Sequence, residues 1–315
     1  MSKPRFRAKS VLLSLIFLVV LFLTAVFLSA PAKFAKSISD GVSLWAVSVL
    51  PATFPFLFLT ALLTALPPFA AFTRKISPWA GKFFRISGAG AGAAVLASVS
   101  GYPVGARLLY DLKTGYQIAK TETFRLACLV TTSGPPFLVG TVGAMMYGSA
   151  SAGWILLVSH LSSVWLVCFL LRFTAKKTPV MPPQLRKSNP NLLYDSLWNA
   201  VVSVLCVGGF IALFYCFGEM LASLGAFRIF GGNLYAEGTL RGLLEMTTGC
   251  NALSALHTPL SLAISCGLVT FGGLCVLCQQ LAYLTRAGVQ ALPFLFVKFL
   301  QAVLAFGLCF LLASI

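Results

Sequence analysis

The stretch LASVSGYPVGARLLYDL, residues 96–112, decides how this chain folds. It continues an apolar segment, passes through Gly101 and Pro103, and then reaches Arg107. Proline removes a backbone donor and glycine permits unusual dihedral angles, so a helix through this stretch breaks. The apolar piece before the break falls short of the roughly 20 residues that cross a bilayer. The stretch therefore predicts a re-entrant segment over residues 88–118.

The composition places the whole chain in a membrane. Of 315 residues, 58% are hydrophobic and only 10% are charged, and the mean hydropathy is +0.92. A soluble domain carries about a quarter charged residues, so this chain lacks the polar surface that water requires. We predict an all-α, polytopic membrane protein whose partner is the lipid bilayer.

The net charge of +16 would suggest nucleic acid in a soluble protein. In a membrane protein, basic residues instead gather in cytoplasmic loops, so we predict no nucleic-acid partner. Cys275 and Cys278 form a C-x-x-C pair without a second ligand pair, and neither His160 nor His257 has metal-ligand spacing, so no metal site is predicted. The sequence shows no Walker A motif and no nucleophile–base constellation, which argues against an enzyme.

About seven apolar segments are long enough to be transmembrane helices. The first follows a basic tail and exceeds the length of a signal-peptide core, so we expect it to stay uncleaved. Residues 72–87 alternate basic and aromatic side chains, which predicts either a helix in the headgroup region or an ordinary cytoplasmic loop. The predicted spans are 11–30, 41–66, 124–147, 152–172, 196–224, 261–284 and 290–313, with interrupted segments at 88–118 and 231–260.

On this topology, 18 of the 23 Lys and Arg residues fall on one side, which predicts a cytoplasmic N-terminus and an outside C-terminus. Each half then consists of one span, one hairpin and two further spans, in that order. The hairpin of the first half opens to the inner side of the membrane, and that of the second half opens to the outer side. The expected organisation is an N-terminal anchor span at 1–38, a first repeat at 39–173, a cytoplasmic linker at 174–193 and a second, inverted repeat at 194–315. Matching interrupted segments in inverted halves indicate the binding site of a transporter.

The first break places a candidate anion site at the tip of the hairpin. A helix that starts after Pro103 and Gly105 exposes free N–H groups, whose partial positive charge favours anions. Arg107 adds a full positive charge in the first turn. Alternatively, Arg107 only caps the cytoplasmic end of the hairpin and reaches toward lipid headgroups.

Glu245 precedes the second break, in the sequence LLEMTTG. A carboxylate between Leu and Met is costly to bury unless it is paired, protonated or bound to a cation. We therefore consider three roles, namely carrying a coupling proton, holding Na⁺, or binding a polar substrate. The structural alternative is a salt bridge to Arg241, four residues earlier on the same helical face. Beyond a coupling Na⁺ or H⁺, no cofactor is predicted.

Two spans contain a further break each. TTSGPPF, residues 131–137, places Ser133 and Gly134 before two prolines, so freed carbonyls can bind an ion or substrate, or the kink serves packing alone. In the corresponding later span, Gly272 and Gly273 precede Gln279 and Gln280, whose place near the cytoplasmic end argues against substrate contact. The predicted substrate-binding residues are Ser100, Gly101, Tyr102, Pro103, Gly105, Arg107, Ser133, Glu245, Thr247, Thr248, Gly249 and Asn251.

Four motifs, SGYPVGAR, SGPPFLVGTVG, LLEMTTG and FGG…QQ, occur in this order. They resemble sporulation integral membrane proteins of the YlbJ type, among the nucleoside recognition (Gate) domain proteins, over about residues 40–310. The resemblance implies two Gate-like repeats, a fold like that of concentrative nucleoside transporters, and a role in endospore formation in a Gram-positive bacterium. For the sporulation branch, it implies transport of dipicolinic acid from the mother cell toward the forespore. The matching motif positions are Gly101, Tyr102, Pro103, Gly105, Glu245, Thr247 and Gly249.

The expected function is a transporter or permease for a small anionic metabolite, with dipicolinic acid as the first candidate. A nucleoside transporter and a non-transporting membrane scaffold for spore assembly are the alternatives. We expect the multi-pass protein in the cell membrane of a spore-forming bacterium. The sequence leaves open the outer forespore membrane as its place and a homo-oligomer as its assembly.

Overall fold

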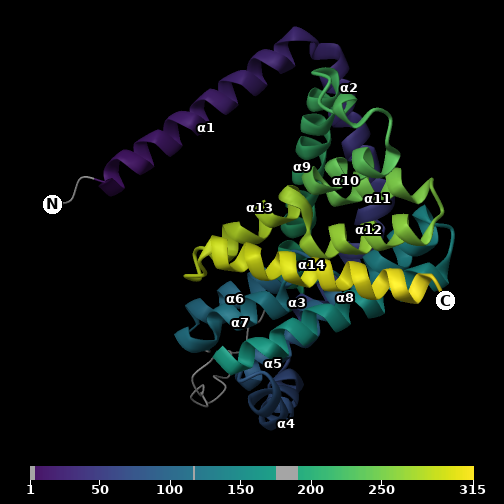
Figure 1. Ribbon diagram of the computed structural model, residues 1–315. Helices are drawn as coiled ribbons and strands as arrows, with labels where there is room; N and C mark the ends of the chain where they lie inside the picture. The colour runs from purple at the N-terminus through teal and green to yellow at the C-terminus, as the bar shows by residue number, and fades with distance from the viewer. Residues whose placement is uncertain (1–3, 116–117, 175–190) are drawn as a thin grey trace.

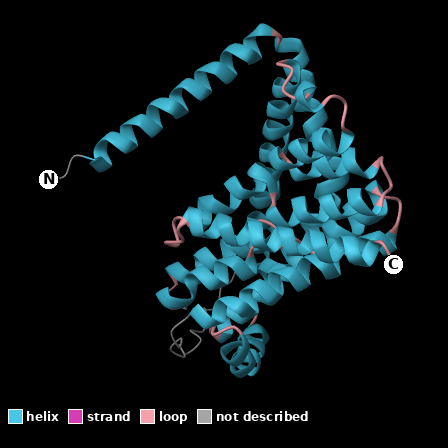
Figure 2. Cartoon of the chain, viewed as in Figure 1, coloured by secondary structure: helices cyan, strands magenta, loops and turns pink. Residues whose placement is uncertain are grey.

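The computed structural model describes residues 4–115, 118–174 and 191–315, and throughout these residues every regular element is a helix (Figure 2). The predicted linker at 174–193 falls mostly outside them. Helix α1 projects away from the body of the molecule, whereas the other helices pack together (Figure 1). The elements of the first half are α1 (Pro4–Ser29), α2 (Pro31–Leu44), η1 (Trp45–Val49), α3 (Leu50–Ala65), α4 (Pro67–Phe83), α5 (Gly88–Ser100), α6 (Val104–Thr114), α7 (Lys120–Val130), η2 (Pro136–Met146), α8 (Ala150–Leu171) and η3 (Arg172–Thr174).

The second half shows the same order of a long helix, a broken helical hairpin, a broken span and a final long helix. Its long first helix packs against α2 and α3, and its last helix packs against α8. The two halves therefore meet through equivalent elements. The elements are α9 (Leu192–Ser223), η4 (Arg228–Phe230), α10 (Leu234–Leu244), α11 (Met246–Ser254), α12 (Pro259–Phe271), α13 (Gly273–Leu284) and α14 (Ala291–Ala313).

Four helices among the described residues are long and apolar enough to cross a bilayer, or six if each of two bent pairs is one span. The bent pairs are α1 with α2 and η1, at 105°, and α3 with α4, at 81°. This confirms a polytopic helical membrane protein. About seven spans were predicted, and the structure has at most six candidates among the described residues. The missing one is the predicted span at 124–147, because the break at 131–135 divides it into two helices of 11 residues, which are too short to be counted.

Helix α4 answers the question left open for residues 72–87. These residues begin inside a helix of 17 residues that starts at Pro67, so the alternative of an ordinary loop is wrong for most of the stretch. The helix is strongly amphipathic, with Trp79 and Phe83 stacked on each other and exposed. Its place in the headgroup region stays a prediction.

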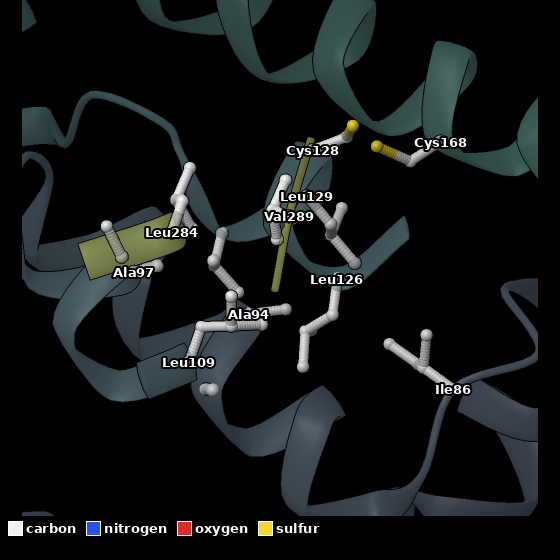
Figure 3. Close-up of a cluster of buried hydrophobic side chains, with 14 of the residues drawn as sticks. Ile86, Ala94, Ala97, Leu109, Leu126, Cys128, Leu129, Cys168, Leu284 and Val289 are labelled. Atoms are coloured by element: carbon white, nitrogen blue, oxygen red, sulfur yellow. The ribbon is translucent and has the colours of Figure 1, made fainter. Parts of the chain in front are cut away.

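A core of small and aliphatic side chains supports the first hairpin. Ala94 and Ala97 of α5 pack with Leu109 of α6 and Leu126 of α7, and Leu284 of α13 joins them (Figure 3). All five side chains are at most 2% exposed, and α5 and α6 pack between α7 and α13. The tip of the hairpin is thereby held at a fixed place inside the bundle.

Candidate functional site

The first hairpin, α5 and α6, turns at Gly101, Tyr102 and Pro103. Helix α5 ends because Gly101 adopts a φ of 78°, a conformation that side chains disfavour. Helix α6 begins at Val104, and no side chain accepts a hydrogen bond from its first N–H groups. Gly105 lies against the carbonyl of Val130, where no Cβ fits. The turn therefore places an uncapped helix N-terminus inside the bundle.

The second hairpin, α10 and α11, turns at a single residue. Glu245 is extended, with φ −140° and ψ 113°, and it is only 1% exposed. Its carboxylate accepts hydrogen bonds from the backbone N–H groups of Thr247 (2.9 Å) and Thr248 (2.7 Å). Glu245 is thus the N-cap of α11, a role in which a carboxylate also compensates the helix dipole.

Glycine brings the two arms of the second hairpin together. Gly249 of α11 packs directly on the backbone of Gly242 of α10, and a Cβ at position 249 would collide with it. Arg241 on the same arm pairs with Glu219 of α9 (2.9 Å) and with Glu237 (3.1 Å). The predicted salt bridge between Arg241 and Glu245 is therefore wrong.

Each hairpin tip contacts the broken span that follows it in its own half. In the first half, the backbone of Gly101 packs on that of Gly134, inside the break between α7 and η2. In the second half, Gly273 packs beside the carbonyl of Gly242, at the break between α12 and α13. The four predicted breaks are therefore arranged as two matching pairs.

A hydrogen-bonded network joins the two halves at this level. Tyr102 at the first tip donates from its hydroxyl to the carbonyl of Val269 (3.1 Å), close to the end of α12. The ammonium of Lys298 on α14 donates to the Tyr102 hydroxyl (3.2 Å) and to the carbonyl of Thr131 (2.8 Å). The first tip is thus held by the second half of the chain.

His160 on α8 supports the break in the first half. The backbone N–H of Ser133 donates to its Nε2 atom (2.9 Å), and Nδ1 lies 2.8 Å from the hydroxyl of Thr270. Because a backbone N–H can only donate, Nε2 is the acceptor and the ring proton resides on Nδ1. His160 therefore bridges the two broken spans.

Both hairpin tips border one small buried pocket of about 40 Å³, called here the central pocket. This volume holds one or two water molecules. Thr60 hydrogen-bonds Ser100 beside it. Its polar lining comes from both hairpins, from α3 and α13, and from the break between α7 and η2. It comprises Thr53, Ser100, Tyr102, Ser133, Glu245, Thr247 and Gln279.

A much larger cavity of about 810 Å³, called here the large cavity, lies between α3, α6, α9 and α13. Gln279 lines both cavities, so they are neighbours. The large cavity also contains Pro103 and Arg107 of the first hairpin, together with Arg286. Its size is in the range of cavities that bind small organic molecules.

Arg107 points from α6 across the large cavity to α9. Its guanidinium donates to the hydroxyl of Ser203 (2.7 Å) and to the side-chain oxygen of Asn199 (2.6 Å). Both partners are neutral, and Arg107 makes no ion pair with any residue that the structure describes. The cavity wall thus carries two arginines, Arg107 and Arg286, and two carboxylates, Asp111 and Asp195, and neither carboxylate lies within ion-pair distance of Arg107.

The structure brings together eight of the twelve predicted binding residues. Six line the central pocket, and Pro103 and Arg107 line the large cavity. Three of the remaining four serve packing or capping: Gly105 and Gly249 permit close backbone contacts, and Thr248 donates its hydroxyl to the carbonyl of Glu245. Asn251 is exposed and lines neither cavity.

Three residues at this centre were missed. Lys298 and His160 contact the broken spans, and Gln279 separates the two cavities although its sequence position argued against contact. For Lys298 the signal was present, because an ionisable residue within an apolar span is a functional candidate by default.

The fold and this centre define a polytopic helical membrane protein in which broken helices from both halves meet at a buried polar site. Over 90% of its length, the chain is 28% identical to the sporulation integral membrane protein YlbJ of Bacillus subtilis (strain 168), covering 79% of that relative. This similarity supports membership of the chain in the YlbJ-type family of sporulation integral membrane proteins. No family model matches the chain, and no solved structure matches it. The nucleoside recognition (Gate) domain therefore stays a prediction.

Proposed function

We propose that this chain is a transporter or permease for a small anionic metabolite, and that dipicolinic acid is its substrate during sporulation. The observation that carries the proposal is the central pocket, where the tips of both broken hairpins meet beside a large cavity. Transporters built from repeats bind their substrates at such a meeting of broken helices. The similarity to a sporulation membrane protein supports the biological setting.

The N-terminal turn of α6 in the first hairpin favours an anion. The N-terminus of α6 has no capping side chain, and Arg107 in its first turn has no carboxylate partner among the described residues. A carboxylate placed here gains both the helix dipole and a charge-assisted hydrogen bond. Dipicolinic acid, a flat aromatic dicarboxylate, offers two such groups.

The volumes of the two cavities indicate that the hairpin tips must move for a substrate to reach the central pocket. The large cavity accommodates a small organic molecule, whereas the central pocket holds only water-sized groups. A substrate therefore enters the centre only when the two tips separate. We propose that one repeat moves against the other, with the N-terminus in the cytoplasm and the large cavity as the entrance.

The test is uptake of labelled dipicolinate into proteoliposomes that contain the purified full chain. We expect saturable uptake that excess uridine does not inhibit and that Arg107→Gln reduces at least tenfold. Arg74→Gln is the matched control, because Arg74 is an exposed arginine of α4 outside both cavities. Uptake that uridine abolishes would show a nucleoside carrier instead. Uptake of neither compound by correctly folded protein would contradict transport and favour the scaffold.

A further inference from the structure

The Lys298 ammonium is the most deeply buried cation among the described residues. The side chain extends from the middle of α14 and has no exposed surface. It lies 5.4 Å from the centre of the Tyr102 ring, and no carboxylate forms an ion pair with it within the described part of the chain. A buried charge without a counterion is rare because its desolvation is costly.

The partners of Lys298 resemble the ligands of a small metal cation. Helix α7 ends at Val130, and residues 131–134 are not helical, so no helical N–H satisfies the Thr131 carbonyl. That carbonyl, the Tyr102 hydroxyl and the Tyr102 ring face all present negative potential to the same point. Oxygen ligands from unwound helices are the ones that hold Na⁺ in transporters with broken spans.

We propose that the ammonium of Lys298 is a resident cation, which occupies a monovalent-cation site formed by the Thr131 carbonyl and Tyr102. The chain then carries its own cation at the first hairpin tip, and its folded state requires no dissociable Na⁺. Because Tyr102 also donates to Val269, this cation joins α14 and the first break to the end of α12. If transport holds as proposed above, uptake is independent of Na⁺.

The test is chemical rescue of stability, which involves no substrate. The purified full chain and Lys298→Ala are melted in detergent, in choline chloride, sodium chloride or methylammonium chloride. We expect the wild-type melting temperature to be the same in all three salts. Lys298→Ala, which leaves a cavity at the ammonium site, melts lower in choline and recovers at least half of the loss in methylammonium. Choline is too large to enter.

Two variants sharpen this result. Lys298→Met replaces the side chain with an apolar one of similar length, and we expect it to melt below wild type in every salt. Lys36→Ala is the matched control, because Lys36 forms only an exposed pair with Asp40, and we expect no response to methylammonium.

Several outcomes would overturn the proposal. These are a Lys298→Met variant as stable as wild type, a loss in Lys298→Ala that is equal in all salts, or wild-type protein that Na⁺ specifically stabilises. If Lys298→Ala does not fold, the wild-type salt series and Tyr102→Phe decide, since Tyr102→Phe removes one ligand and lowers the melting temperature equally in all salts. Absence of dipicolinate uptake would contradict only the proposed transport function, and it would leave the stability test of Lys298 unaffected.

Discussion

The two broken hairpins have the same shape and opposite electrostatics. At the second tip, Glu245 places its own carboxylate on the N-terminus of α11. At the first tip, the N-terminus of α6 has no such side chain. The second hairpin therefore contains its own anion, whereas the first is the anion site of the function proposed above.

The arginines of the two hairpins, Arg107 and Arg241, also differ in whether a carboxylate pairs with them. Both contact α9, but at positions far apart along it: Arg107 reaches Asn199 and Ser203, and Arg241 reaches Glu219. Only Arg241 is neutralised, by Glu219 and Glu237. The comparison teaches that the same backbone plan can anchor one hairpin and prepare the other to bind.

The largest expected effect tests the shared backbone plan. Gly105→Ala and Gly249→Ala each insert a Cβ into a neighbouring backbone, so we expect each to lower the free energy of unfolding by about 3 kcal/mol. Gly218→Ala is the control, because a Cβ there meets nothing within 4 Å, and it is expected to be neutral or stabilising. Thermal unfolding in detergent measures all three. Equal behaviour of Gly249→Ala and Gly218→Ala would refute the close contact.

The next effect tests the internal anion. Glu245→Ala leaves two buried N–H groups without an acceptor, so we expect a loss of about 2 kcal/mol. Asn233→Ala removes the equivalent cap of α10 at an exposed site, and its expected loss is about 1 kcal/mol. Glu245→Asp should keep most of the stability. A fully stable Glu245→Ala would mean that the carboxylate does not hold the second tip.

The open anion site predicts a binding effect of intermediate size. Arg107→Gln keeps a hydrogen-bond donor near α9 but removes the charge, so we expect the affinity for dipicolinate to fall about tenfold, or ~1.4 kcal/mol. Calorimetric titration of the purified protein measures this change. An unaltered affinity would place the anion elsewhere.

The smallest effect separates the two arginines. Arg241→Gln breaks half-buried ion pairs, so we expect a loss of about 1 kcal/mol that diminishes at high salt, with no change in anion affinity. Unfolding at low and high salt, followed by the same titration, checks both statements. Weakened anion binding in Arg241→Gln would remove the distinction between the hairpins.

Local chemistry made most of the helix breaks predictable from the sequence. The residues that meet at the central pocket were not predictable in the same way, because their contacts depend on packing between distant parts of the chain. Glycine and proline disrupt a helix wherever they fall, so Gly101, Pro103 and Gly272 indicated their turns from sequence alone. The alternative of a salt bridge between Arg241 and Glu245 failed because i, i+4 spacing assumes a continuous helix, whereas α10 ends at Leu244 and Glu245 is extended.

The roles of Lys298 and Gln279 depend on tertiary contacts. The hydrogen-bonding partners of Lys298 lie 167 and 196 residues away in the chain, beyond any local pattern. Gln279 was expected near the cytoplasmic end of its span, but α13 packs against α6 and brings it beside the first hairpin. Apolar composition indicated the bilayer, but it did not indicate which polar residues meet inside it.

The glycine contacts at the two tips have a kinetic consequence. Gly101 meets the backbone of Gly134, and Gly273 meets the backbone of Gly242, so at these two points backbone packs on backbone without an intervening side chain. At these two points one backbone can slide past the other, as in a shear movement. Moving the first tip away from the second half must break the hydrogen bond from Tyr102 to the carbonyl of Val269, so this bond contributes to the activation barrier. Tyr102→Phe should therefore exchange between conformations faster than the wild type.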